Sequence, residues 1–317
     1  MKTIYTLSFL IISTVLHAQS PEEYAIQNEF QLTGDSISFP LTIVNSYPFI
    51  SGEINGVKGK LMFDTAHRYA LDINNKIVPL PSQKVEGDGF VGSGQKFKRY
   101  TNDAIKEVKL INGLHFQNLK QIGSANYDFI QNDITPDFIG FIGHDFFEGY
   151  LFKLDYTKRK LTFYKNTASR ASSKDFLAGE KVLAVLNFET RKLPNIPMMK
   201  VDVNDVEMLA LFDTGGSYGS LEITDKDAEG LMKKKNLINY GRDGSDDNLF
   251  SLEKVKMNPQ LTVDLIGIYK NSTDDNSPVR KALGITEDTV LTFAYRFLVQ
   301  YKTVWDYKRK KIYVLEY

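Results

Sequence analysis

Short runs of apolar residues, separated by turn-forming residues, divide most of the chain into predicted β-strands. Residues 49–54 and 59–63 form two such runs, and Asn55-Gly56 between them is typical of a tight hairpin turn. Tyr and Phe, which strands favour, are plentiful, with 17 and 21 residues. The same pattern predicts three further hairpins: 151–155 with 160–164, 198–203 with 208–212, and 299–305 with 311–315.

Two segments have the pattern of a helix. Thr224 is a typical helix cap, and Asp225 and Asp227 follow it where a first turn favours acidic residues. We expect this helix to run to about residue 237. A second, short helix is expected over residues 145–150.

The spacing of these elements indicates a duplicated chain. Pro48 precedes Asp64 by 16 residues, and Pro197 precedes Asp213 by the same 16. Segments 154–161 and 305–312 are similar to each other and follow the two Asp residues at nearly equal distances. We therefore predict a first unit over residues 19–165, a linker rich in Ser, Ala and charge over 166–180, and a second unit over 181–317.

The first 18 residues have the pattern of a secretory signal peptide. Lys2 is followed by an apolar stretch and then by Ala18 at a plausible cleavage point. The stretch is too short to span a bilayer comfortably, so a membrane anchor is the less favoured interpretation. We expect an exported protein, periplasmic or secreted, with no stable membrane insertion after cleavage. Residues 20–39 are predicted to be either a propeptide or an edge strand.

Composition excludes several classes of function. Lys and Arg number 39 and Asp and Glu also 39, a balance that argues against a nucleic-acid-binding protein. The chain has no Cys, which excludes thiol catalysis and Cys-bound metals. Beyond the predicted signal peptide the only histidines are His67, His115 and His144, without the spacing of a zinc site. We expect neither a metal nor a cofactor.

Two short motifs match the patterns of other enzymes without their context. Residues 215–219 match the G-x-S-x-G motif of serine hydrolases, but no His follows His144 to act as the base. Residues 87–92 match G-x-G-x-x-G, but no helix is predicted after them. We expect a flexible hairpin tip there.

Two apolar runs end in the same three-residue pattern. Residues 61–66 end in Asp64-Thr65-Ala66, and residues 209–215 end in Asp213-Thr214-Gly215. A single ionised carboxylate is costly to bury at the end of an apolar strand, whereas two that meet can share a proton. Two ordinary turns would not explain the matched positions in both units. We therefore predict that Asp64 and Asp213 meet in one site.

These strings resemble the retropepsin-like and pepsin-like aspartic proteases that carry both lobes in one chain, and the texture is similar to that of bacterial secreted aspartyl proteases. The resemblance covers nearly all of the chain after the signal peptide. The family's Asp-Thr-Gly is intact at 213–215 and nearly intact at 64–66. Its apolar-apolar-Gly element, which packs behind the catalytic loop, is present at 141–143, and the register places residues 292–294 in the second copy.

The resemblance implies a mostly β fold of two similar lobes with the active-site cleft between them. It implies an aspartic endopeptidase in which Asp64 and Asp213 activate a water, Thr65 and Thr214 brace the two loops, and Ala66 and Gly215 support them. A flap over the substrate is expected at the Gly-rich segment, with Gly87, Gly89, Phe90, Gly92 and Gly94, and its counterpart at Gly241 and Gly244. The expected partner is a peptide or protein substrate, and the expected state is a monomer.

Four positions depart from the family pattern. Ala66 replaces a Gly and resists positive φ, and Ala294 replaces the packing Gly of the second lobe. His67 and Gly216 stand where a small hydroxyl residue or Ala is common. If His67 points inward, it places a positive charge near the pair. These departures leave open an alternative, a catalytically inactive pepsin-like protein that binds a peptide or cell-envelope ligand in the interlobe cleft.

Overall fold

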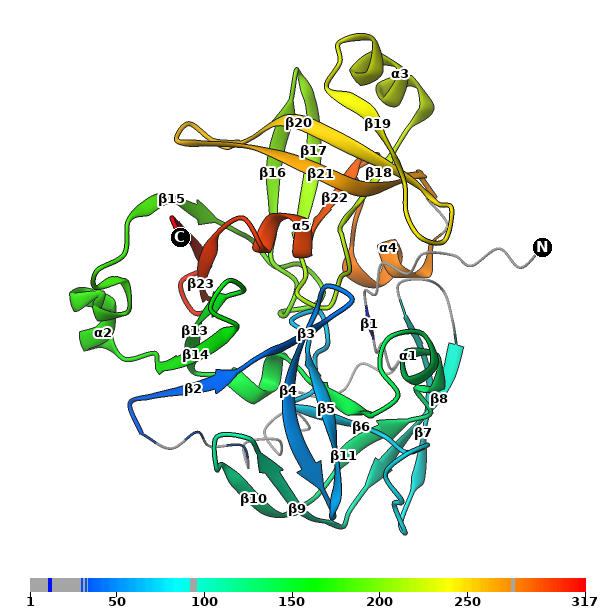
Figure 1. Ribbon diagram of the computed structural model, residues 1–317, viewed down its shortest axis with the longest axis vertical. Coiled ribbons are helices and arrows are strands. Elements are labelled where there is room, and N and C mark those ends of the chain that lie inside the picture. Colours follow the sequence, from blue (N-terminus) through cyan, green and yellow to red (C-terminus); the bar gives the residue numbers. More distant parts are fainter. Residues whose placement is uncertain (1–10, 13–29, 31, 33, 92–95, 275–276) are drawn as a thin grey trace.

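The computed structural model describes residues 11–12, 30, 32, 34–91, 96–274 and 277–317. This part of the chain forms two similar β lobes and a third sheet built from strands of both halves (Figure 1). The mostly β, two-lobed fold expected from the sequence is confirmed.

The N-terminal lobe is built on a sheet with the order β1-β7-β8-β11-β6-β12-β5-β4-β9-β10, and β3 pairs with β4. In it β12 runs parallel to β5, and β11 runs parallel to β6. The strands are β1 (Ile11–Ile12), β3 (Thr42–Val44), β4 (Tyr47–Ile54), β5 (Val57–Phe63), β6 (Leu71–Asn74), β7 (Lys84–Val91), β8 (Lys96–Asn102), β9 (Ile105–Leu110), β10 (His115–Leu119), β11 (Ile122–Ala125) and β12 (Phe138–Ile142).

The C-terminal lobe repeats this arrangement with the order β16-β17-β22-β18-β21-β20-β19. It matches the run β4-β5-β12-β6-β11-β8-β7 strand for strand, and its two parallel pairs, β17 with β22 and β18 with β21, are the equivalent ones. The β9–β10 hairpin is an addition in the first lobe. The strands are β16 (Met198–Val203), β17 (Val206–Phe212), β18 (Ser220–Ile223), β19 (Leu237–Arg242), β20 (Asn248–Asn258), β21 (Leu261–Ser272) and β22 (Val290–Phe293).

The third sheet joins the two halves, with the order β15-β24-β23-β13-β14-β2. The repeated Asp-Tyr segments form its two hairpins, which meet where Phe152 pairs with Trp305. In each turn the repeated Asp accepts a backbone N–H, from Lys158 at 2.7 Å and from Arg309 at 3.1 Å. The strands are β2 (Ser36–Pro40), β13 (Tyr150–Asp155), β14 (Lys160–Lys165), β15 (Val182–Asn187), β23 (Lys302–Asp306) and β24 (Lys311–Leu315).

β2 lies at one edge of this third sheet, where it pairs with β14. Of the two roles predicted for residues 20–39, the structure therefore gives residues 36–40 the edge-strand role. The residues before 30 lie outside the described part of the chain, except for β1.

The helices are short. They are α1 (Asp128–Asp133), η2 (His144–Phe147), α2 (Ala168–Ser173), η3 (Asp175–Leu177), α3 (Asp225–Lys233), α4 (Pro278–Leu283) and α5 (Tyr295–Leu298). Thr224 caps α3 as expected, and its hydroxyl accepts the N–H of Asp227 at 3.2 Å. The predicted end of this helix at 237 was wrong, because Lys235 adopts a positive φ and Leu237 begins β19.

All four predicted hairpins are present. In the first, Asn55 and Gly56 have φ of 49° and 86°, the left-handed conformation that a two-residue turn requires. The expected strand start at residue 299 was wrong: α5 occupies Tyr295–Leu298, and β23 begins at Lys302. The expected short helix at 145–150 is a single turn over His144–Phe147, because Tyr150 already belongs to β13.

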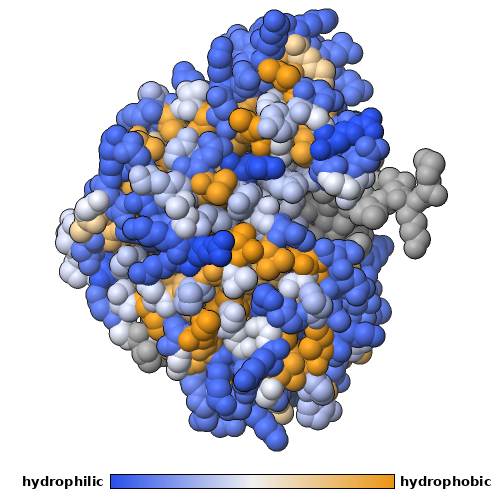
Figure 2. Space-filling model, viewed as in Figure 1, coloured by the Kyte–Doolittle hydropathy of each residue, from blue (hydrophilic) through white to orange (hydrophobic). Residues whose placement is uncertain are grey.

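Apolar residues on the face shown in Figure 2 form several separate patches among hydrophilic ones. In the part of the chain that the structure describes, we find no helix that is both long and apolar enough to cross a membrane.

Candidate functional site

The two Asp-Thr loops occupy equivalent places at the ends of β5 and β17. The backbone N–H of Asp64 donates to Ile142 on β12, and that of Asp213 donates to Phe293 on β22, each at 3.0 Å. The apolar runs before each Asp are thus buried central strands, each held by a parallel neighbour. This arrangement explains why a hydrophobic run leads into each acidic residue.

A chain of aromatic rings supports both loops from below. Phe63, directly before Asp64, packs edge-on against Phe152 at 5.2 Å between ring centroids. Phe152 stacks on Trp305 at 5.4 Å, and Trp305 packs against Phe212, directly before Asp213, at 5.9 Å. All four rings are buried, and each contributes about 1.5–3 kcal/mol by leaving water. The third sheet therefore fixes the distance between the two loops.

Thr65 and Thr214 hold the loops to each other. The N–H of Thr65 donates to the hydroxyl of Thr214 at 2.9 Å, and the N–H of Thr214 donates to the hydroxyl of Thr65 at 3.1 Å. The Thr214 hydroxyl also donates to the carbonyl of Phe63 at 2.9 Å. These are the reciprocal bonds that the family resemblance implied for the two threonines.

The bonds bring the carboxyl groups of Asp64 and Asp213 together in a buried site. Asp64 Oδ1 accepts the N–H groups of Ala66 at 2.8 Å and His67 at 3.1 Å, and Asp213 Oδ1 accepts that of Gly215 at 2.7 Å. Both Asp side chains are buried, with exposures of 0% and 1%. The second oxygen of Asp64, Oδ2, has no hydrogen-bond partner among the described residues.

The electrostatics make the pair unequal. Burial raises the pKa of Asp64 to about 6, against the opposing influence of His67 and the backbone N–H groups. Burial and the neighbouring charge of Asp64 raise the pKa of Asp213 well above its ordinary value. Two carboxylates in contact cannot both ionise, so one proton stays between them. The shifts place that proton on Asp213, beside the carboxylate of Asp64.

Gly215 packs directly on the Asp64 carboxyl, since an ideal Cβ there would lie 2.2 Å from Asp64 Cγ. Ala66, at the equivalent place in the first lobe, carries a methyl group that packs into an apolar cluster of the second lobe with Ile196 and Leu211. The backbone at Ala66 does not have a positive φ, and neither does that at Gly215. The expected conflict between Ala66 and the loop conformation was therefore wrong.

Ala294 is accommodated because Gly216 lies against it. An ideal Cβ on Gly216 would be 2.8 Å from the Ala294 methyl carbon. In the first lobe the arrangement is reversed: His67 carries the large side chain, and Gly143 approaches the carbonyl of His67 so closely that a Cβ would lie 2.4 Å from it. The departures at Gly216 and Ala294 thus form one complementary pair.

The Gly-rich segment is a hairpin of β7 and β8, with Gly89 paired to Phe97. Gly87 and Gly89 lie within β7 rather than at the tip, which corrects the expected position of the turn. Phe90 lies in the same strand, and Gly92 and Gly94 fall outside the described residues. In the second lobe, Gly241 lies in β19, and Gly244 lies in the turn before β20.

Sequence reasoning missed three groups near the pair. The buried Tyr47 of the first lobe hydrogen-bonds Ser217 of the second. The buried Asn195 side chain donates to the carbonyl of Ala66 at 2.5 Å and thereby adds a second link between the lobes. Asp72 and Arg99 form a buried ion pair beside His67. The duplication offered no clue to Tyr47, since the equivalent position in the second lobe is Ile196.

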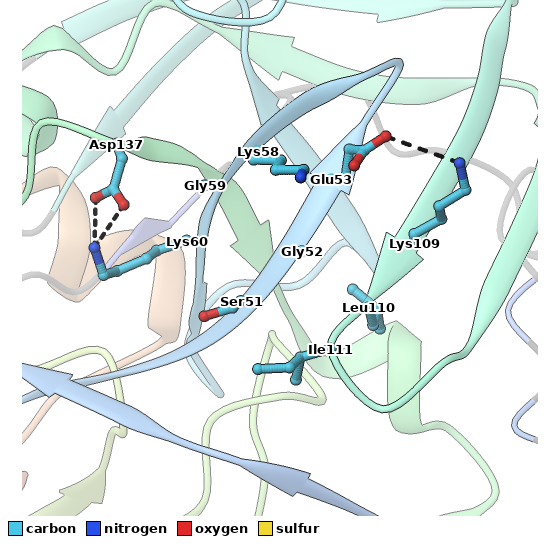
Figure 3. A pocket seen from close by; sticks show the side chains of 10 residues that line it. All are labelled: Ser51, Gly52, Glu53, Lys58, Gly59, Lys60, Lys109, Leu110, Ile111 and Asp137. Atoms are coloured by element: carbon cyan, nitrogen blue, oxygen red, sulfur yellow. Dashed lines mark hydrogen bonds and ion pairs between the residues drawn. The ribbon is translucent and has the colours of Figure 1, made fainter.

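A pocket of about 480 Å³ lies on the first lobe, away from the Asp pair (Figure 3). Lys60, in its wall, is four residues before Asp64 on β5, a distance of about 13 Å along a strand. Its charged groups pair with one another: Lys60 with Asp137 at 2.6 Å, and Lys109 with Glu53 at 3.8 Å. The pocket therefore presents no group prepared for chemistry.

Comparison with known proteins gave one kind of match. No protein-family model matches the chain, and no match was found among curated proteins. Among solved structures, the chain is similar to the crystal structure of aspartic proteinase from Irpex lacteus, with a TM-score of 0.49 and 14% sequence identity, over 89% of this chain and 97% of that chain.

Proposed function

We propose that this protein is an aspartic endopeptidase that hydrolyses peptide bonds with Asp64 and Asp213. The observation that carries the proposal is the pair itself: two buried carboxyl groups from duplicated loops, braced by reciprocal threonine bonds and unequal in pKa. A buried acid pair is costly to maintain, and strained or costly groups gather at functional sites.

In the proposed mechanism the Asp64 carboxylate accepts a proton from a water as the water oxygen attacks the peptide carbonyl carbon. Asp213 donates its proton to the carbonyl oxygen, and a tetrahedral diol forms. Asp64 then passes its proton to the leaving nitrogen, and Asp213 recovers a proton from the diol as the C–N bond breaks. One water is consumed, and both carboxyl groups return to their starting states.

The substrate is proposed to be a peptide in extended conformation under the β7–β8 hairpin. Supporting this choice, β7 already pairs antiparallel with a short extended segment, β1, at Val91 and Phe90. Main-chain pairing of this kind recognises extended peptides largely irrespective of their side chains. Gly87 and Gly89 are proposed to let the hairpin move. Export, on the evidence of the first 18 residues, would bring the enzyme to periplasmic or secreted substrates.

The test is incubation of the purified protein with a library of denatured-protein peptides, followed by mass spectrometry of the products over pH 3–8. We expect new peptide termini that are absent when the buffer alone is used. If no peptide is cut at any pH, the endopeptidase proposal fails. Saturable binding of library peptides without cleavage would instead support a peptide-binding protein.

A further inference from the structure

We propose that His67 is a positioning residue whose positive charge keeps the negative charge of the acid pair on Asp64; this inference rests on the proposed function. The residue follows Asp64 by three positions, and its backbone N–H donates to Asp64 Oδ1 at 3.1 Å. Its side chain is fully buried. The second lobe has Gly216 at the equivalent position, so only one of the two loops carries an ionisable ring.

Packing fixes the orientation of the His67 ring. The ring stacks on Phe141 of β12 with 4.9 Å between centroids and 13° between planes. Its Nε2 lies 3.4 Å from Oδ2 of Asp72 on β6, a fully buried carboxylate. The register of the sheet secures this contact, because Phe141 and Asp72 are direct partners in β12 and β6. The ring cannot turn away without losing both contacts.

Asp72 is in turn held by Arg99 of β8. Arg99 Nη1 donates to Asp72 Oδ2 at 2.7 Å, and its Nε faces Glu86 of β7 at 3.4 Å. Gly123 makes room for this pair, since a Cβ there would lie 2.8 Å from Arg99 Nη2. Arg99 is fully buried and lies over the Tyr69 ring at 4.3 Å. The network therefore reaches from the acid pair to both strands of the β7–β8 hairpin.

The balance of charges favours a protonated His67. The guanidinium of Arg99 faces two carboxylates, those of Asp72 and Glu86, and leaves one negative charge unmatched. An imidazolium at His67 matches it, and a buried negative charge is costly without such a partner. The charged or ionisable groups facing the ring or joined to it through Asp72 are Asp64, Tyr69, Asp72, Arg99, Glu86 and Tyr127.

A positive charge beside one member of the pair breaks its symmetry. It favours the ionised form of Asp64, and His67 lowers the pKa of Asp64 against the effect of burial. Asp213 has Gly216 at the corresponding place, and its pKa is raised by its neighbour's charge instead. The identity of the residue after each Asp-Thr-small string thus decides which carboxyl group takes the water's proton.

The test is the pH titration of the Asp carboxyl groups by carbon-13 NMR in wild type and in His67→Gln, with His115→Gln as the matched control. His115 also contacts a carboxylate, Glu107 at 3.2 Å, but on the exposed β9–β10 hairpin. We expect His67→Gln to raise the lower apparent pKa of the pair by about one unit or more, and His115→Gln to leave it unchanged. An unchanged titration in a folded His67→Gln variant overturns the proposal.

A second readout needs no substitution. Nitrogen-15 shifts of the His67 ring in the wild type report whether both nitrogens carry protons, and we expect the doubly protonated form at pH 6. A neutral ring at that pH overturns the proposal even if His67→Gln fails to fold. Both readouts are independent of turnover, so a wild type that cuts no peptide would contradict the endopeptidase function and leave the role of His67 to these titrations.

If the wild type is active, the pH profile gives a third readout. His67→Gln should move the acidic limb of kcat/KM to higher pH. Below that limb, kcat/KM should fall about tenfold for every pH unit that the limb moves, with KM little changed. A purely structural role would instead lower kcat/KM by the same factor at all pH values.

Discussion

Gly216 and Ala294 fit together behind the second catalytic loop: an ideal Cβ on the glycine would lie only 2.8 Å from the alanine methyl carbon. The chain thus exchanges the small and the larger residue within one contact and keeps the total volume. Volume-conserving exchanges are the ones that packed interiors tolerate best.

This contact predicts the behaviour of a double variant. Gly216→Ala alone should lower the free energy of unfolding by about 1–3 kcal/mol, because the added methyl has no room. Adding Ala294→Gly should recover most of the loss. Chemical denaturation measures both, with Gly230→Ala as the control, since nothing lies within 4 Å of a Cβ there. Independent, additive effects of the two substitutions would contradict the proposed pairing.

Gly215 and Ala66 should respond differently to exchange. Gly215→Ala puts a methyl group into the Asp64 carboxyl, where a Cβ would be 2.2 Å from Cγ, so we expect a loss of activity of at least about a hundredfold. Ala66→Gly removes a methyl from an apolar cluster and should cost about 1 kcal/mol of stability while activity remains. Rate and denaturation measurements on both variants test this; an active Gly215→Ala enzyme would show that the loop is displaced from the position described.

The Thr214 hydroxyl takes part in both the brace and the first lobe. Thr214→Val keeps the shape but leaves the buried N–H of Thr65 and carbonyl of Phe63 unpaired, which should cost about 2–4 kcal/mol. Thr214→Ser retains the hydroxyl and is the matched control, with a loss of less than about 1.5 kcal/mol expected. Thermal unfolding of the two variants decides between the roles of hydroxyl and methyl, and equal losses would assign the effect to packing alone.

The raised pKa of Asp64 predicts the pH profile of cleavage. Ionised Asp64 is required, so kcat/KM should fall as the pH drops through about 6. Asp213 must keep its proton, and because its pKa is raised well above the ordinary value, the profile should stay level for a range above pH 6. Initial rates on a neutral peptide substrate from pH 4 to 8 test this. Full activity at pH 4 would be incompatible with a buried Asp64 whose pKa is raised.

The hairpins and the meeting of Asp64 with Asp213 could be predicted because their determinants are local or repeated. Asn55-Gly56 selects its turn by backbone conformation alone, and the two Asp-Thr strings occur at matched positions in a duplicated chain. The end of α3 was mispredicted because apolar Leu237 continues the helical pattern although it belongs to a strand. There tertiary pairing with β20 outweighs local preference.

The surroundings of the pair could not be predicted in the same way. Asp72 and Arg99 are 27 residues apart, and they meet because β6 and β8 lie on either side of β11. Nothing in the spacing of His67 indicates which carboxylate its ring faces. The fit of Ala294 likewise depends on a contact with Gly216, 78 residues earlier in the chain, so the sequence pattern registers two departures where the structure has one pair.

The most direct measurement of the central claim, that Asp64 and Asp213 act as one catalytic unit, is the cleavage rate of wild type, Asp64→Asn, Asp213→Asn and the double variant on one peptide at one pH. Because neither carboxyl group can do the work of both, we expect each single variant to lose at least about a thousandfold and the double variant to lose no more than either. Circular dichroism should show that all four are folded. A single Asn variant that cleaves as fast as the wild type would contradict the claim.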